Sequence, residues 1–300
     1  MKRHIVFPLN FDSRALLLDE INPEWEEGVR KLHEENYVRL IAGLKIELGT
    51  HNFEEKLTNF KELGPAPFSI IGYHNEFFRQ CRYSFIHGFY YPALTSACAL
   101  GERIFNHIIL DLRENYKGKP SYRKVYNKGS FCDWGAAIDV LVEWNVFQHE
   151  EVEAEYRKLA DIRHRSIHFN QSTYSQHRDE ALIALNTVSK IISLQFGYPT
   201  IGHKWAIDGT VGHSFIKKEA EDDPFIKKYY LPQSPKVGYK FAMRMDNHGE
   251  WLFLDYHDYD GTTISDEEFA KLFNERDITE MVPTEPPLPT GIIVQKIVRS

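Results

Sequence analysis

Hydrophobic positions between residues 23 and 197 recur at the three- and four-residue spacing of amphipathic helices, in one segment after another. Gly64, Gly88 and Gly197 follow three of these segments, and glycine is the residue that most often ends a helix. The pattern predicts a helix that begins near Pro23 and further helices over 52–63, 68–87, 89–116, 131–147, 150–169 and 176–196. It also predicts a loop-like stretch at 115–130. Asn52 with Glu55 predicts a capped start for the second of these helices.

The pattern changes after Pro199, where turn sequences become frequent and apolar runs shorten to strand length. Two such runs, 240–245 and 250–255, flank a predicted hairpin turn at 246–249. Ser265 with Glu268 forms a capping-box pattern and predicts a short helix at 267–276. The proline-rich stretch 282–291 is typical of extended chain.

These patterns predict a mainly α fold in three parts. Residues 1–67 form a mostly helical N-terminal extension, residues 68–198 a helical bundle, and residues 199–300 a small α+β module that is rich in acids.

Composition places the chain among folded globular proteins. Apolar residues make up 42% of the 300 residues and charged residues 26%, so disordered and collagen-like classes are excluded. Apolar runs stay shorter than a membrane span requires, and polar residues interrupt the N-terminal segment before a secretory signal forms. Three widely spaced cysteines favour a reducing compartment, so we expect a cytoplasmic protein that makes no contact with membranes.

The net charge of −7 is unevenly distributed. Residues 246–285 hold twelve acids and two bases, a local charge of −10, whereas the other 260 residues sum to +3. A polyanionic partner is therefore compatible with the first two-thirds of the chain. The acidic segment either forms a separate docking surface or folds over a basic surface as a restraint.

The most specific chemical feature is the sequence IRHRSIHF at 162–169, with Arg163, His164 and His168. An arginine matches a phosphate with two parallel hydrogen bonds, and a histidine exchanges protons near neutral pH. Together they suit RNA cleavage by the ribose 2′-hydroxyl, which requires neither a metal nor a protein nucleophile. On an ideal helix Arg163 and His168 lie about 140° apart, so they converge only if the helix ends near His168 or a second protomer contributes. The alternative is a solvated helix face.

Small residues precede this motif by about 60 positions. Ala93, Ala97 and Gly101 permit close helix packing, and Glu102 follows them directly. If Glu102 is buried it needs a partner, and an arginine of the motif helix is the natural candidate. Otherwise Glu102 is an exposed helix residue.

The ordered pair of helices resembles the HEPN superfamily, in which a helix with small residues and an acid precedes a helix carrying R-polar-x3-H. The resemblance covers residues 68–197, so the bundle is interpreted as HEPN-like. It is carried by Gly88, Tyr90 or Tyr91, Ala93, Ala97, Glu102, Arg163, His164 and His168.

The resemblance implies a metal-independent endoribonuclease, a hydrolase of toxin–antitoxin or antiviral defence systems that acts as a homodimer without a cofactor. It implies that Arg163 binds the scissile phosphate, that His168 is the general acid or base, and that His164 orients the arginine. It also implies an RNA substrate and a possible antitoxin or other defence-system protein partner.

Further basic residues extend the predicted RNA-binding surface. Arg157, Lys158 and Arg165 lie on the motif helix and suit contacts with the RNA backbone, although each of them also fits a solvated helix face. The stretch 117–129 alternates bases with tyrosines, which is compatible with single-stranded RNA or with an ordinary solvated loop.

Competing signals are weaker. His164 and His168 have the spacing of two metal ligands, but no third ligand is evident, so no metal site is expected. The stretch 256–267 departs from a calcium loop at its first position. Phosphate-loop, serine-hydrolase and dinucleotide motifs do not occur.

Three hypotheses follow. The first is a HEPN-type endoribonuclease; the second is a non-catalytic HEPN-fold module that binds RNA, a nucleotide or a protein partner; the third is a structural helical subunit. Only the first requires both Arg163 and His168 for its chemistry.

Overall fold

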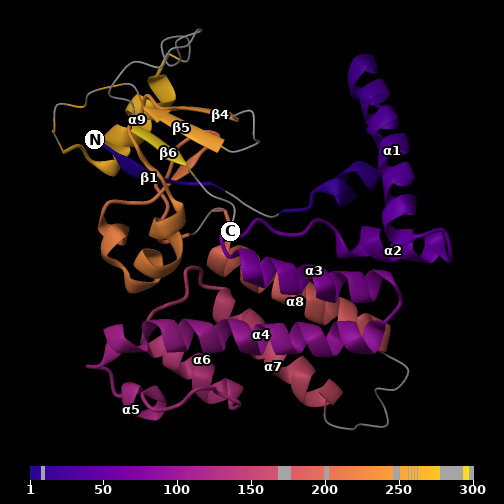
Figure 1. Cartoon of the computed structure of the whole chain (residues 1–300), viewed down its shortest axis with the longest axis horizontal. Coiled ribbons are helices and arrows are strands. Elements are labelled where there is room, and N and C mark those ends of the chain that lie inside the picture. The colour runs from indigo at the N-terminus through magenta and orange to yellow at the C-terminus, as the bar shows by residue number, and fades with distance from the viewer. Residues whose placement is uncertain are drawn as a thin grey trace. The chain divides into compact units, whose positions relative to one another are not determined.

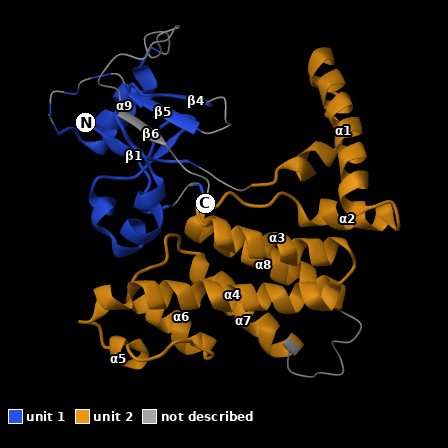
Figure 2. Ribbon diagram, in the orientation of Figure 1, with its two compact units in different colours: residues 1–8, 198–300 blue, residues 9–197 orange. Residues whose placement is uncertain are grey.

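The protein is described here by a computed structural model that covers residues 1–7, 11–167, 177–198, 203–245, 251–255, 257, 259, 261, 263–277 and 293–296. The chain forms two compact units (Figure 2). The helical unit comprises residues 9–197, and the sheet unit comprises residues 1–8 and 198–300. The expected fold class, mainly α with a small C-terminal α+β part, is confirmed at this coarse level.

The division of the chain differs from the expectation at its N-terminus. The later boundary lies between Gly197 and Tyr198, one residue from the expected break. Residues 1–8, however, belong to the sheet unit, and the rest of the expected 1–67 extension lies in the same compact unit as the bundle. The reason is a strand near the N-terminus whose pairing partners lie more than 200 residues later.

The helical unit is built around one long central helix. α4 packs against α3, α6, α7 and α8 (Figure 1). It buries Ala93, Ala97 and Ile104 completely, with Pro92 confined to its first turn. In chain order the elements are η1 (Arg14–Leu18), α1 (Glu27–Leu48), α2 (Phe53–Leu63), α3 (Gly72–Ile86), α4 (Tyr90–Leu112), η2 (Arg113–Tyr116), α5 (Tyr122–Val125), α6 (Trp134–Glu143), α7 (Val152–Ile167) and α8 (His177–Phe196).

Two local expectations need correction. Asn52 precedes α2 as expected, but its side chain makes no capping hydrogen bond. With φ 51° and ψ 36° it adopts the left-handed conformation that asparagine tolerates, so its contribution is conformational. The stretch 115–130, expected to be loop-like, contains the end of η2 and the short helix α5.

The described part of the sheet unit contains two antiparallel sheets. In the first, β1 (Arg3–Val6) lies between β2 (Ser214–Phe215) and β3 (Lys236–Val237). In the second, β5 (Trp251–Asp255) lies between β4 (Ala242–Met245) and β6 (Ile293–Lys296). The β4–β5 pair confirms the two predicted hairpin strands; their turn lies outside the described residues, as does the proline-rich stretch 282–291. The remaining elements are η4 (Glu219–Asp222), η5 (Ile226–Tyr230), η6 (Leu231–Gln233) and α9 (Asp266–Glu275).

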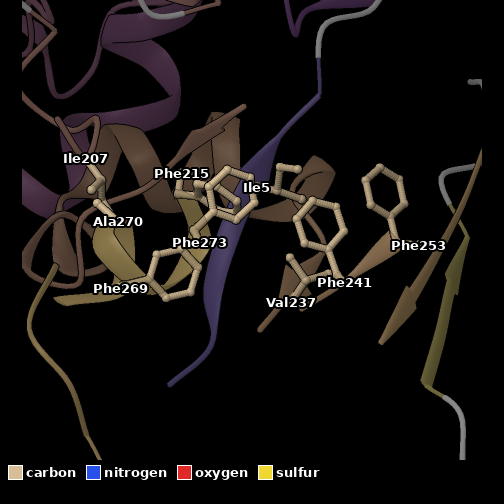
Figure 3. Packing of buried hydrophobic residues seen from close by; sticks show 9 residues of the cluster. All are labelled: Ile5, Ile207, Phe215, Val237, Phe241, Phe253, Phe269, Ala270 and Phe273. Atoms are coloured by element: carbon tan, nitrogen blue, oxygen red, sulfur yellow. The ribbon is translucent and has the colours of Figure 1, made fainter. Parts of the chain in front are cut away.

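Aromatic side chains form the core of the sheet unit. Phe215 of β2 contacts both Phe269 and Phe273 of α9 edge-on, with ring centroids 4.9 and 4.8 Å apart. Ile5 of β1 joins the same buried cluster (Figure 3). The predicted cap of α9 is also present, since the Ser265 side chain accepts a hydrogen bond from the Glu268 amide at 3.1 Å.

No helix in the described part of the chain is both long enough and apolar enough to cross a membrane.

A buried arginine ties the N-terminal strand to α9. The Arg3 guanidinium donates to Asp266 Oδ1 at 2.6 Å and to the Ile264 carbonyl at 2.7 Å, and it lies over the Phe269 ring. Arg3 is only 2% exposed. A charge at this depth is tolerated because a carboxylate and a carbonyl replace the water that it loses.

We expect Arg3→Met to destabilise the sheet unit by about 3 kcal/mol, because it leaves the Asp266 carboxylate without its charged partner. Urea unfolding combined with hydrogen exchange resolves the loss in β1, β2 and β3. Arg39→Met, which breaks an exposed pair on α1, is the control and should change stability by less than about 0.5 kcal/mol. Unchanged protection of β1 in Arg3→Met would contradict this role of Arg3.

Candidate functional site

The motif helix is α7, and the structure describes part of the predicted constellation. Arg163 and His164 both lie on α7, where Arg163 is partly buried and His164 is exposed. His168 lies outside the described residues, so the predicted convergence of Arg163 and His168 stays a prediction.

α7 approaches α4 closely at Gly101. A methyl group placed on Gly101 would lie 2.4 Å from Leu159 Cδ2 and 3.2 Å from Trp134 Cη2. Both distances are shorter than normal contacts, so a larger residue at this position requires Leu159 and Trp134 to shift. The small residues of α4 therefore have the packing role expected for them.

Glu102, Trp134 and Arg163 meet beside this contact. Glu102 Oε2 accepts a hydrogen bond from Trp134 Nε1 at 2.9 Å and lies 3.2 Å from Arg163 Nη2. The Arg163 guanidinium also lies over the Trp134 ring, 5.6 Å from its centroid. The expected pairing of Glu102 with an arginine of the motif helix is confirmed. Because the Arg163 side chain is 30% exposed, part of it remains accessible to a ligand.

The start of α6 holds Trp134 in this position. Asp133 caps α6 by accepting a hydrogen bond from the Ala136 amide at 3.0 Å. One turn along α4 from Glu102, the Asn106 side chain bonds both the amide and the carbonyl of Phe131, at 2.7 and 3.2 Å. The chain entering α6 is thus fixed to α4, and Trp134 has little freedom to leave Glu102.

A hydrogen bond joins the end of α7 to the first turn of α8. The Ser166 hydroxyl lies 2.9 Å from Glu180 Oε2 and 2.7 Å from the Ile162 carbonyl. Glu180 is 8% exposed, so this polar contact is shielded from water and is stronger than a surface contact. It fixes the backbone of α7 within one turn of Arg163.

The basic residues predicted to bind RNA on α7 all have acidic neighbours. Arg157 pairs with both Asp139 and Glu153, at 2.9 and 2.8 Å. Lys158 lies 3.8 Å from Glu155, and Arg165 lies 4.0 Å from Glu180. These carboxylates partly neutralise the α7 surface, which weakens its attraction for a polyanion.

Other reactive groups at the site are limited. Cys98, one turn before Glu102, is fully buried, and burial raises the pKa of its thiol to about 12. The thiol is therefore protonated at neutral pH and is a poor nucleophile. Among the described residues, no group of three or more His, Cys, Asp or Glu side chains is arranged to hold a metal ion.

Sequence reasoning did not identify three contributors to this arrangement, namely Trp134, Ser166 and Glu180. The pattern of α6 marks Trp134 only as an apolar residue after a capping aspartate. Its hydrogen bond crosses 32 positions to Glu102, and no local signal in the sequence indicates such a pairing. The sequence spacing of Ser166 and Glu180 does not mark them as a contacting pair either.

No protein-family model matches the chain, and no curated protein or solved structure is significantly similar to it.

The close approach at Gly101 predicts that the effect of Gly101→Ala on the stability of the helical unit depends on the residue at position 159. Alone, Gly101→Ala should destabilise the helical unit by about 1 kcal/mol, because overpacking outweighs the better helix propensity of alanine. In the Leu159→Ala background the same change should be about 1 kcal/mol more favourable than it is alone, since the contact with Leu159 Cδ2 is gone and only the 3.2 Å contact with Trp134 Cη2 remains. Urea unfolding of the four proteins measures both effects. Equal effects of Gly101→Ala in the two backgrounds would contradict the contact.

Proposed function

We propose that the chain is a metal-independent endoribonuclease of the HEPN type that acts in toxin or antiphage defence. The observation that carries the proposal is the packing of α4 on α7 through small residues, which brings Glu102 to Arg163. If the R-x4-H sequence occurred by chance on a solvated helix face, its arginine would have no need of an acidic partner on a neighbouring helix.

In the proposed reaction, Arg163 binds the scissile phosphate through donors that Glu102 does not occupy. Its planar guanidinium carries five N–H groups, of which Nη2 faces Glu102. Glu102 and Trp134 then hold the guanidinium in place, which reduces the entropy lost when the phosphate binds. His164 is proposed to help orient the arginine.

His168 is proposed as the proton-transfer group. It takes the proton from a ribose 2′-hydroxyl, whose oxygen attacks phosphorus while the bond to the 5′ oxygen breaks. A proton is returned to that leaving oxygen. The products are a 2′,3′-cyclic phosphate and a 5′-hydroxyl, and no oxidant or further reactant is needed.

A homodimer would complete the site. Each chain supplies a single Arg163 and a single His168, which are too few to hold the phosphate and to serve both oxygens. A two-fold axis beside α7 would place two of each in one cleft. We propose that this assembly acts in the cytoplasm on RNA, and that a defence-system or antitoxin protein controls it.

The second candidate is a HEPN-fold module that binds RNA, a nucleotide or a protein partner without catalysis. The observation that favours it is the contact of Arg163 with Glu102 and Trp134, which satisfies the arginine in the absence of substrate. On this hypothesis Arg163 is structural, and replacing it lowers stability without changing any reaction.

Cleavage in EDTA tests the proposal. Arg163→Ala and His168→Ala should each reduce the cleavage rate of a mixed tRNA and mRNA substrate at least about 100-fold. Circular dichroism and urea unfolding should show an intact fold, and the wild-type products should carry cyclic phosphate ends. His177→Ala, at the start of α8, is the matched histidine control. Unchanged cleavage by His168→Ala would remove that residue from the mechanism, and no cleavage by the wild type would favour the binding module.

The assembly makes a separate prediction. Light scattering should find a dimer at micromolar concentration, and activity per chain should fall on dilution as the dimer dissociates. A charge reversal on the exposed face of α7, Asp161→Arg, should shift that fall to higher concentration. A monomer with full activity would contradict the shared site.

A further inference from the structure

A group of cations without acidic partners lies away from α7, between α4 and α6. Residues 113–128, called here the basic-aromatic segment, contain six lysines and arginines and one acid, Glu114. Glu114 pairs with Lys117 at 2.9 Å. Within the part of the chain that the structure describes, Lys119, Arg123 and Lys124 have no carboxylate oxygen within 4.0 Å. In contrast to the α7 cations, these charges remain available to a partner.

The segment is a folded surface and not a free loop. Ser121 and Val125 are each 2% exposed, and Ser121 Oγ accepts a hydrogen bond from Trp144 Nε1 at 2.8 Å. Tyr116 stacks on the Trp144 ring at 4.6 Å with 8° between the planes. Because these contacts already order the segment, binding a ligand there requires little further loss of entropy.

Two tyrosines lie among the cations. The segment forms an open hollow lined by Lys117, Gly118, Lys119, Pro120, Tyr122, Arg123 and Tyr126. The Tyr122 and Tyr126 rings lie 5.9 Å apart and are inclined by 33°, and Tyr126 is 52% exposed. An exposed and a partly exposed aromatic ring beside unpaired cations match a strand whose bases stack and whose phosphates are neutralised. A duplex keeps its bases stacked inside and offers them no such contact.

We propose that the basic-aromatic segment is a binding site for single-stranded RNA. The choice of RNA rests on the proposed function. Lys119, Arg123 and Lys124 neutralise phosphates, and Tyr122 and Tyr126 stack on bases.

The site and the segment lie on the same helical unit. Ten residues separate Glu102 from Leu112 at the end of α4, a distance of about 15 Å along the helix axis, and η2 begins the segment at the next residue. An RNA strand that is bound to the segment and runs back along α4 would approach Arg163. The segment thus supplies the affinity for RNA that the paired cations of α7 lack.

Fluorescence anisotropy of the full chain tests the site. The probe is a labelled 2′-O-methyl oligouridine of about 12 nucleotides, which cannot be cleaved through its 2′ oxygens. Tyr126→Ala should weaken binding about tenfold through lost stacking. The triple change Lys119→Gln, Arg123→Gln and Lys124→Gln should lower the slope of log affinity against log salt by about 2.

A matched triple change controls for total charge. Lys31→Gln, Arg39→Gln and Lys61→Gln remove three exposed cations from α1 and α2 and should change affinity by less than about twofold. Duplex RNA and polyglutamate of equal length should bind at least about tenfold more weakly than oligouridine. Circular dichroism should show that all variants keep the wild-type helix content.

Binding and cleavage separate the two proposals. A lower affinity of the segment variants for oligouridine supports the site, whether or not the wild-type chain cleaves RNA. If the variants lose affinity and the wild type does not cleave RNA, the chain is a binding module and not a nuclease. Affinity and salt slope that match the wild type in both Tyr126→Ala and the segment triple variant would overturn the site. Equal affinity for polyglutamate, or no binding of oligouridine by the wild type, would overturn it as well.

Discussion

The close approach of α4 and α7 at Gly101 is the constraint on which the candidate site depends. Glu102 follows Gly101 directly, so the depth at which α7 packs decides whether Arg163 reaches that carboxylate. Trp134 lies against the same contact and donates to the same oxygen. A wider spacing would separate all three side chains at once. Packing between apolar groups therefore sets the geometry of the charged ones, as expected of an interior that is close-packed.

Two basic surfaces of the helical unit have different properties. On α7 the cations have carboxylate neighbours, which fix their side chains and reduce the local field. Along residues 117–128 most cations lack such neighbours, and tyrosines lie between them. Rigid, paired arginines suit the precise positioning of one group, whereas unpaired lysines suit loose attraction of a long polyanion. The two surfaces thus have complementary properties for a single extended ligand.

Local sequence patterns predicted the helices and strands better than they predicted the contacts between distant residues. The helical periodicity, the Ser265 cap and the β4–β5 strands were all predictable, because each depends on residues a few positions apart. The pairing of Glu102 with the motif helix was expected for a buried acid; the pair is present, although the Glu102 side chain is only partly buried, with 28% of it exposed. The role of Trp134 was not, nor were the acids beside Arg157, because these contacts depend on how whole helices pack. The place of β1 in the sheet unit depends on partners at 214–215 and 236–237, which no local pattern indicates.

The central position of β1 has a consequence for synthesis of the protein. The ribosome makes this strand before the two strands that flank it in the sheet, which follow about 210 and 230 residues later, a delay of roughly 10 to 45 s at ordinary elongation rates. The helical unit lies wholly within that interval and can fold before the sheet unit has its parts. Until then Ile5 and Val6, both buried in the finished protein, remain in contact with water or with a chaperone. β1 thus remains an unpaired apolar strand until β2 and β3 have been made.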